Sequence, residues 1–286
     1  MKRFFVITNE SRDRNCEKAR QITDHLNARG AACSYVSIER DSDETSSEVR
    51  AIDELPDDTD AVIVLGGDGT FIQSAGIIAP KKIPMIGINL GHLGYLAEVD
   101  KEKITPALDR LLNDDYTVED RIMLSGTPVI AGKEAGSFYA FNDIVVRTPG
   151  SSVGYFEIEV NGTYLTTISG DGLIIATPTG STAYNMSAGG PIIEPGSSTI
   201  VLTPICPLEL ESRSVVLSAE NTVVIKLIRP EGRRRKTAGV YFDGGEEISL
   251  SSDDSVCIKK ASSAVRLIKL SKESFLEVLS RKMQRQ

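Results

Sequence analysis

The sequence predicts an α/β amino-terminal domain with an open, mostly parallel sheet, then an all-β carboxyl-terminal domain and a final helix. Three observations support this prediction. The chain has 286 residues, which is about two domains of ordinary size. Strand-like and helix-like segments alternate over residues 1–120, as in parallel sheets covered by helices. Beyond that point, short strands follow one another with turn residues between them, as in all-β domains.

The first domain begins with a short apolar strand and an amphipathic helix. Ala19, Ile22 and Leu26 repeat at helical spacing, and Gly30 is a stop signal for the helix. Residues 41–60 hold nine acidic residues and one basic residue, so we expect a solvated loop or a short helix there. Helices are expected over 12–29 and 70–79, and strands over 4–8, 32–38, 61–65 and 83–88.

The second domain begins with a strong hairpin signal. Asn161-Gly162 separates two strand-like runs, Tyr155–Val160 and Thr163–Thr167, and accepts the positive φ of a tight hairpin turn. Further strands are expected over 215–217, 223–228, 239–242, 248–250, 256–260 and 265–269. Ser271 is the expected N-cap of the final helix. One apolar face of that helix would hold Phe275, Leu276, Leu279 and Met283.

Composition and charge exclude several classes of function. The net charge is −8 and the pI is about 5.0, which disfavours nucleic-acid binding because that binding depends on many Lys and Arg contacts. No apolar run approaches the roughly 18 residues of a membrane span. The four cysteines are scattered and there are two histidines, so we expect no zinc site and a reducing cytoplasm.

The segment from Asn161 to Ile205 is unusual in its lack of charge. Asp171 and Glu194 are its only charged residues, although a quarter of the whole chain is charged. The segment is rich in Gly, Ser and Thr but also holds apolar runs, so disorder does not explain it. Two explanations remain open at this point: a loop that lines a ligand, or a buried β segment with long turns.

The sharpest candidate site is Gly66-Gly67-Asp68-Gly69-Thr70. It follows an apolar strand and opens a helix, which places it at the carboxyl edge of a parallel sheet, where such sheets bind ligands. The glycines allow close approach of a phosphate, and the helix start offers free N–H groups. No lysine follows as in a P-loop. Asp68 can accept a proton from an attacking hydroxyl, and the alternative is a tight turn with a helix-capping aspartate.

Two further segments are candidates for binding a nucleotide. In the run from Gly170 to Tyr184, a strand lies between two glycine turns and is followed by hydroxyl side chains, which suit ribose, amide and phosphate oxygens. Those hydroxyls belong to Thr177, Thr179, Ser181 and Thr182. Asn142-Asp143 can bind vicinal ribose hydroxyls or a base edge, although an Asn-Asp pair alone also fits a simple turn.

Together these motifs resemble those of the NAD kinases. The resemblance rests on GGDGT at 66–70, Asn142-Asp143, the run at 170–184 and Ala188-Gly189-Gly190-Pro191, and it extends from about residue 60 to 245. GGDGT alone is shared with diacylglycerol and sphingosine kinases and, loosely, with phosphofructokinases. The run at 170–184 is far more specific to NAD kinases.

The resemblance implies ATP-dependent phosphorylation of the adenosine ribose 2′-hydroxyl of NAD, with a divalent metal, usually Mg²⁺. Asp68 would be the catalytic residue, which takes or orients the proton of that hydroxyl. Many relatives carry Glu at the position of Asp143, so the shorter side chain alters that contact. No residue is assigned to the metal. The phosphate turn would comprise Gly66, Gly67, Gly69 and Thr70. The residues implied to bind NAD are Asn142, Asp143, Asp171, Thr182, Ala183, Tyr184 and Ser187.

The resemblance also implies an α/β domain over 1–119, an all-β NAD-binding domain over 120–268, and a helix over 269–286 that packs back on the first domain. A homodimer or homotetramer is expected, with NAD and ATP as partners and without nucleic acid or membrane. Two alternatives are a lipid kinase built on GGDGT and a non-catalytic NAD(P) sensor. The hydroxyl-rich segment 166–187 disfavours the first, and the intact Asp68 disfavours the second.

Overall fold

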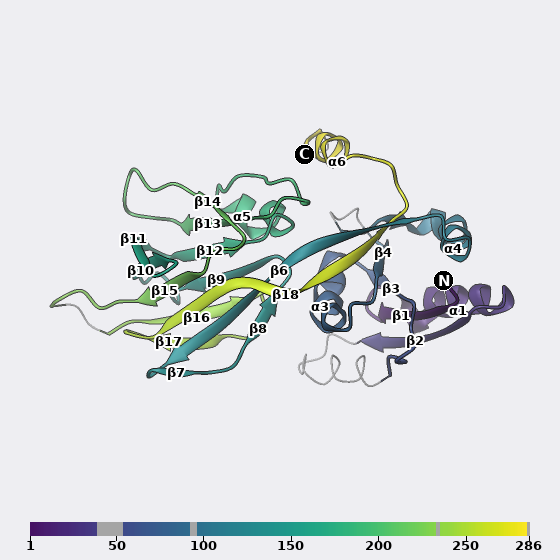
Figure 1. Cartoon of the computed structure of the whole chain (residues 1–286), viewed down its shortest axis with the longest axis horizontal. Coiled ribbons are helices and arrows are strands. Elements are labelled where there is room, and N and C mark those ends of the chain that lie inside the picture. Colours follow the sequence, from purple (N-terminus) through teal and green to yellow (C-terminus); the bar gives the residue numbers. More distant parts are fainter. Residues whose placement is uncertain (39–53, 92–95, 233–234, 285–286) are drawn as a thin grey trace. The chain divides into compact units, whose positions relative to one another are not determined.

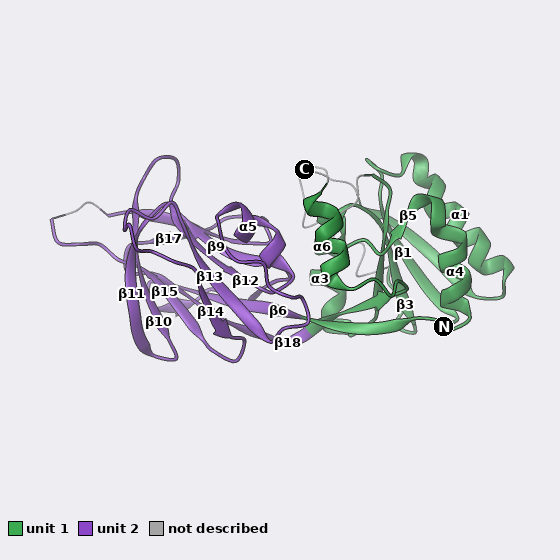
Figure 2. Ribbon diagram, turned by 90° about the horizontal axis from the view of Figure 1, so that it is seen from above, with its two compact units in different colours: residues 1–121, 264–286 green, residues 122–263 purple. Residues whose placement is uncertain are grey.

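The computed structural model describes residues 1–38, 54–91, 96–232 and 235–284. The chain forms two compact units (Figure 2). Unit 1 contains residues 1–121 and 264–286, and unit 2 contains residues 122–263. Most of the acidic segment over 41–60 lies outside the described residues.

The strands of unit 1 are β1 (Arg3–Asn9), β2 (Ala32–Ile38), β3 (Ala61–Gly66), β4 (Met85–Asn89) and β5 (Val99–Asp100), joined by the end of β18 (Ser255–Lys269). They lie in the order β2-β1-β3-β4, and all of these pairings are parallel (Figure 1). The strand β5 and the end of β18 also pair with β4 in the parallel sense. The predicted mostly parallel sheet is therefore confirmed.

The helices of unit 1 are α1 (Glu17–Ala28), α3 (Asp68–Ile78), α4 (Ile104–Leu112) and α6 (Phe275–Met283), with 3₁₀ turns η1 (Arg14–Cys16), η2 (Ala79–Lys81) and η3 (Lys101–Lys103). Three of them, α1, α3 and α6, correspond to the predicted helices. The helix α4 is not among the predictions, although its buried residues repeat at helical spacing. Over the described ranges, no helix is long and apolar enough to cross a membrane.

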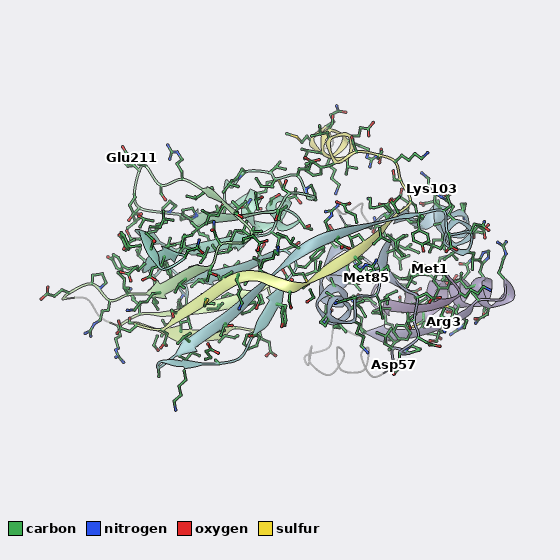
Figure 3. All side chains as sticks on the ribbon, viewed as in Figure 1. Met1, Arg3, Asp57, Met85, Lys103 and Glu211 are labelled. Atoms are coloured by element: carbon green, nitrogen blue, oxygen red, sulfur yellow. The ribbon has the colours of Figure 1, made fainter. Side chains whose placement is uncertain are left out.

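The hydrophobic core of unit 1 is built around its parallel sheet. Every residue of β3 is buried, as is every residue of β4, in which Met85 is fully enclosed (Figure 3). Parallel strands are covered on both faces, which explains why these two read as continuous apolar runs in the sequence. The helices α1 and α4 contribute Ala19, Ile22, Leu26, Ala107, Leu108 and Leu111 to this core.

Unit 2 is built of antiparallel strands. Its strands are β6 (Thr117–Ile130), β7 (Lys133–Glu134), β8 (Phe138–Ala140), β9 (Asp143–Arg147), β10 (Gly154–Val160), β11 (Thr163–Gly170), β12 (Gly172–Ala176), β13 (Thr199–Ile205), β14 (Val215–Ser218), β15 (Val223–Leu227), β16 (Thr237–Phe242) and β17 (Ile248–Ser251). It also holds the 3₁₀ turn η4 (Gly180–Thr182) and the short helix α5 (Tyr184–Ser187).

The strands of unit 2 form two faces around one core. One sheet has the strand order β14-β13-β12-β9-β16-β17. The strands β11, β10, β15 and β18 are hydrogen-bonded in that order and form the second face. The core cluster contains side chains from both, including Ile144, Leu173, Phe156 and Ile225. The Asn161-Gly162 hairpin is confirmed between β10 and β11, with φ of 51° and 74° at the two turn residues. An all-β second half is therefore confirmed.

One predicted break is wrong. Strands expected over 256–260 and 265–269 form one continuous strand, β18, which passes from unit 2 into unit 1. The four residues between them are Ala261, Ser262, Ser263 and Ala264. These residues are small but include no Gly, Pro, Asn or Asp, so nothing forces a turn, and the extended backbone continues through them.

The start of the final helix also differs from the prediction. The N-cap of α6 is Ser274, not Ser271. Ser274 and Glu277 form a capping box, in which the Ser274 N–H donates to the Glu277 carboxylate at 2.7 Å. The predicted apolar face is divided, because Leu276 is 68% exposed and Met283 is 65% exposed, whereas Phe275 and Leu279 are half-buried.

Candidate active site

The GGDGT turn connects β3 to α3 in unit 1. The strand ends at Gly66, Gly67 is the N-cap, and Asp68 is the first residue of the helix. The half-buried Asp68 carboxylate accepts a hydrogen bond from the Leu96 N–H at 3.2 Å. The helix start carries a partial positive charge, which favours a carboxylate at this position. The predicted placement of an acidic side chain at the carboxyl edge of the sheet is thus observed.

The two glycines before Asp68 have different structural roles. A Cβ on Gly66 would lie 2.6 Å from the Thr70 Oγ1 and 2.8 Å from the Thr70 Cβ, so packing requires glycine there. A Cβ on Gly67 would meet no described atom within 4 Å. The φ of Gly67 is −107°, which any residue can adopt. Within the described chain, neither packing nor backbone geometry requires glycine at position 67.

A second polar residue lies beside the turn. Asn89 ends β4 and pairs in register with Gly66, the last residue of β3. Its side-chain oxygen accepts a hydrogen bond from the Gly91 N–H at 2.9 Å, and the Leu90 N–H donates to the Gly66 carbonyl at 3.3 Å. The first bond fixes the loop after β4, and the second joins that loop to the end of β3. The buried Asn89 thus helps to fix the edge of the sheet at the GGDGT turn.

In unit 2, Asn142 and Asp143 lie in a turn held by another carboxylate. The two oxygens of Asp243 accept hydrogen bonds from the backbone N–H groups of Phe141 at 2.6 Å, Asn142 at 2.7 Å and Asp143 at 3.1 Å. Asp243 itself has a φ of 51°, a left-handed conformation that Asp tolerates better than most residues. One half-buried carboxylate thus fixes three successive amides.

The buried Asp143 and the half-buried Asp243 both have raised pKa values. Burial raises the pKa of Asp143 from its ordinary 3.8 to about 7, and the nearby Asp243 charge adds to this shift. Burial also raises the pKa of Asp243 to about 6, and the three backbone N–H donors oppose that rise. Asp143 therefore holds a proton over much of the range below neutral pH, and a protonated carboxyl can donate a hydrogen bond.

The run that follows β12 packs directly on this turn. The Thr177 N–H donates to the Asn142 carbonyl at 2.8 Å, and the Thr177 hydroxyl donates to the Phe141 carbonyl at 2.7 Å. A Cβ on Gly180 would lie 2.0 Å from the Asn142 carbonyl oxygen, so only glycine fits. The turn at Asn142 and the loop at 177–183 therefore form one rigid assembly.

The hydroxyl groups of this loop are largely used within it. The fully buried Ser181 hydroxyl donates to the Pro178 carbonyl at 2.6 Å and accepts from the Ile193 N–H at 2.9 Å. The Thr182 hydroxyl donates to the Thr179 carbonyl at 3.3 Å. The expectation that this whole run offers hydroxyls to a ligand is therefore wrong for Thr177 and Ser181. The predicted Tyr184 and Ser187 are exposed, and Thr182 and Ala183 are half-buried.

Asp171 lies away from the Asn142 turn. In the pairing of β9 with β12, Asp143 faces Ala176 at one end, whereas Gly172 faces Arg147 at the other. Asp171 precedes Gly172, and its carbonyl accepts from the Thr148 N–H at 2.9 Å. Five residues of extended strand separate these ends by roughly 15 Å. Unit 2 thus gathers Asn142, Asp143, Thr182, Ala183, Tyr184 and Ser187 at one end and holds Asp171 at the other.

Comparison with known proteins decides the family. Residues 4–116 match the ATP-NAD kinase N-terminal domain, and residues 142–270 match the ATP-NAD kinase C-terminal domain. The chain belongs to the NAD kinase family. The NAD kinase of Lachnospira eligens is 38% identical over 99% of this chain and 100% of its own length. The NAD kinase of Agathobacter rectalis is also 38% identical, over 99% of both chains.

Solved structures of NAD kinases share this fold. A yeast NADH kinase complexed with NADH aligns with a TM-score of 0.82 at 20% identity, covering 99% of this chain and 88% of the yeast chain. An Archaeoglobus fulgidus NAD kinase in complex with ATP aligns with a TM-score of 0.74 at 22% identity, covering 98% of each chain. Membership in this family makes the protein an ATP-dependent phosphotransferase.

One residue that shapes this NAD kinase site carries no role in the sequence-based prediction. Asp243 fixes the Asn142 turn, and the signal for it is an Asp-Gly pair at the end of a strand-like run. Asp243 and Asn142 lie 101 positions apart in the chain, so no local pattern links them.

Proposed function

We propose that this chain transfers the γ-phosphoryl group of ATP to the 2′-hydroxyl of the adenosine ribose of NAD, giving NADP and ADP. The observation that carries this proposal is the GGDGT turn, with Asp68 at the start of α3 and an open surface at Gly67. The 38% identity to NAD kinases over the whole chain supports the choice of substrates.

In the proposed reaction, Asp68 orients the ribose hydroxyl and takes its proton. The bond between the 2′-oxygen and the γ-phosphorus forms as the bond from that phosphorus to the bridging oxygen of ADP breaks. A ribose hydroxyl is a weak acid and loses its proton late, so the carboxylate acts mainly by orienting it until then. The Leu96 N–H, 3.2 Å from one Asp68 oxygen, holds the carboxylate in place for that task. The phosphate lies against the turn formed by Gly66, Gly67, Gly69 and Thr70.

We assign the binding of NAD to unit 2. The contacts would come from Asn142, Asp143, Thr182 and Ala183 of the rigid assembly, and from Tyr184 and Ser187 of the helix α5 that directly follows it. Asp143, with a pKa raised to about 7 by burial, can donate a hydrogen bond to a ribose or amide oxygen when protonated. Asp171 lies at the far end of β12, so its proposed contact is with a part of the dinucleotide remote from that at Asn142.

The divalent metal enters, in this proposal, as part of the ATP substrate. Among the residues that the structure describes, no three His, Cys, Asp or Glu side chains gather into a metal site. Mg²⁺ bound to the phosphates would offset the charge that spreads over them during transfer. We further propose a cytoplasmic location, since the four cysteines form no disulfide. The homodimer or homotetramer that we propose follows from the family resemblance alone.

The direct test is to incubate the purified protein with ATP, Mg²⁺ and NAD and to assay NADP. We expect NADP and ADP to form in equal amounts. Phosphorylation of a diacylglycerol without NADP formation would instead favour a lipid kinase. Tight NADP binding without any turnover would favour a sensor.

A further inference from the structure

A glutamate with a buried side chain lies two residues after the amide that holds Asp68. The Leu96 N–H donates to the Asp68 carboxylate at 3.2 Å. Glu98 follows on the same segment, and its side chain is only 6% exposed. A buried carboxylate is costly unless its charge is paired and its oxygens accept hydrogen bonds. The partners of Glu98 therefore show what this segment is fixed to.

Those partners come from the end of β18 and the residues directly after it. One carboxylate oxygen of Glu98 accepts hydrogen bonds from the backbone N–H groups of Leu270, at 2.8 Å, and Ser271. The other oxygen pairs with the Lys269 ammonium, whose side chain is 30% exposed. Hydrogen bonds to an ionised acceptor are roughly twice as strong as neutral ones. Glu98 thus fixes the segment that carries Leu96 to residues about 172 positions later in the same unit.

The opposite side of the segment packs on β4. The Glu98 N–H donates to the Gly87 carbonyl at 3.0 Å. A Cβ on Gly87 would lie 3.1 Å from the Ala97 Cα and 3.4 Å from the Leu96 carbonyl oxygen, so the absence of a side chain lets the segment lie close to the strand. Every residue of β4 is buried. The segment 96–98 is therefore held between a buried strand and the bonds of the Glu98 carboxylate.

The residues after β18 have further anchors. The Arg110 guanidinium donates to the Leu270 carbonyl at 2.7 Å, and the Leu270 side chain belongs to the hydrophobic core of unit 1. We therefore expect these residues to stay in place without Glu98. Leu96 and Ala97, by contrast, are only half-buried, so the bonds of Glu98 contribute a larger share of what holds them.

We propose that Glu98 is a positioning residue for the phosphoryl transfer, because it fixes the Leu96 N–H that holds the Asp68 carboxylate. The inference rests on the proposed function, since it takes Asp68 as the group that orients the ribose hydroxyl. In this role Glu98 contacts neither substrate and transfers no proton. A misplacement of about 1 Å at a reacting group can lower a rate by about 10²-fold. Loosening the segment 96–98 therefore lowers kcat without removing a substrate contact.

The test begins with Glu98→Gln, which keeps one acceptor oxygen and removes the charge that pairs with Lys269. Glu102→Gln is the matched control, because the Glu102 side chain is 69% exposed and lies four positions later. Initial rates at varied ATP and varied NAD give kcat and each KM separately. We expect Glu98→Gln to lower kcat by about 10- to 10²-fold. Both KM values should stay within about threefold of wild type, and Glu102→Gln should have wild-type kinetics.

A double-mutant cycle with Asp68→Ala separates positioning from a general loosening of the fold. If Glu98 acts through Asp68, Glu98→Gln changes kcat by less than about twofold once Asp68 is alanine, because the two effects are then not additive. An equal fold-loss of kcat in both backgrounds would overturn the proposal. A wild-type kcat in Glu98→Gln, or an equal loss in Glu102→Gln, would also overturn it.

A second variant covers the case in which Glu98→Gln does not fold. In Gly87→Ala, the new methyl group presses on Ala97 from the side of β4 and leaves the partners of Glu98 intact. We expect this variant to lower kcat with little change in either KM. A wild-type kcat in folded Gly87→Ala would show that the position of the segment 96–98 does not affect the transfer, and would overturn the proposal.

Failure of the proposed function gives a different result. In that case the wild-type protein itself makes no NADP, and hydrogen exchange at the Leu96 amide then tests Glu98 independently of turnover. The same measurement applies if the kcat of Asp68→Ala is too low to measure. Faster exchange at this amide in Glu98→Gln than in Glu102→Gln would support the positioning role, and equal exchange would overturn it.

Discussion

Asp243 is the residue on which the Asn142 turn depends. Its two carboxylate oxygens accept three backbone hydrogen bonds, from Phe141, Asn142 and Asp143. Hydrogen bonds to a charged acceptor are stronger than neutral ones, and a buried N–H that loses its acceptor is costly. The shape of the proposed NAD contact therefore follows from a residue that lies about a hundred positions later in the chain.

We predict that Asp243→Asn destabilises the fold by roughly 1–3 kcal/mol, because the new amide group would face a backbone N–H donor. Asp253→Asn is the matched control, since Asp253 also has a positive φ, of 82°, but is exposed. Denaturant unfolding measures both free energies. Equal stabilities of the two variants would show that the three hydrogen bonds do not hold the turn.

The raised pKa values of Asp143 and Asp243 also predict how the stability of the protein depends on pH. The folded pKa values of Asp143 and Asp243, about 7 and about 6, both exceed the ordinary value of 3.8. The folded state therefore binds more protons than the unfolded state between about pH 4 and 7, and stability falls as the pH rises through that window. Each such group contributes a slope of at most about 1.4 kcal/mol per pH unit.

Asp143→Asn removes the group with the larger shift. We expect this variant to gain stability relative to wild type as the pH is raised from 4.5 to 7.5, as measured by unfolding midpoints across the range. Parallel curves for the two proteins would mean that Asp143 does not titrate in this window.

At the scale of the elements, the connection between β3 and α3 holds one glycine that packing requires and one that packing does not require. Gly66 has no room for a Cβ beside Thr70, whereas Gly67 faces open space within the described chain. A ligand that approaches the turn would meet Gly67 first. We therefore expect substitution by alanine to lower the stability of the protein at Gly66 but not at Gly67.

We predict that Gly66→Ala destabilises the protein by about 1–3 kcal/mol through overpacking against Thr70. Gly67→Ala should change stability by less than about 1 kcal/mol, because its backbone conformation suits alanine. It should nevertheless raise the KM for ATP, since the new methyl group occupies space that the phosphate needs. Thermal unfolding and initial-rate kinetics on both variants measure this, and normal ATP kinetics in folded Gly67→Ala would place the phosphate elsewhere.

At the scale of the whole molecule, each unit carries its own core and its own part of the proposed site. Asp68 belongs to unit 1, and the Asn142 assembly belongs to unit 2. The strands β6 and β18 each contribute residues to both units. Each unit therefore carries one part of the proposed site on its own core, and two strands run from one unit into the other.

We predict that NAD alone protects the Asn142 assembly from amide exchange. A ligand that binds only the folded state slows the opening of the segments that it contacts. Hydrogen–deuterium exchange with and without NAD should show slower exchange over 141–143 and 177–187. Protection confined to unit 1 would contradict the assignment of NAD to unit 2.

The sequence was sufficient to predict the fold class, because its main signals are local. Continuous apolar runs mark β1 and β3, and Asn161-Gly162 marks one hairpin. The predicted positions of Asp68 at a helix start and of Asn142 before a strand follow from the same local signals. The correct N-cap of α6 could also have been predicted from the sequence, since Ser274 and Glu277 have the spacing of a capping box.

The remaining features depend on contacts between distant segments, which periodicity does not reveal. The bonds of Asp243 to the Asn142 turn arise only when residues about a hundred positions apart come together in the folded chain. The use of the Ser181 hydroxyl within its own loop depends on Ile193, twelve residues later. The strand register alone places Asp171 away from the Asn142 turn.

The most direct test of this account is the turnover of Asp68→Ala at saturating ATP and NAD, measured together with its NAD affinity. We predict that NAD binds with its wild-type dissociation constant, while kcat for NADP formation falls by at least about 10²-fold, the usual contribution of a general base. A normal kcat in this variant would contradict the account, because Asp68 would then have no part in the transfer.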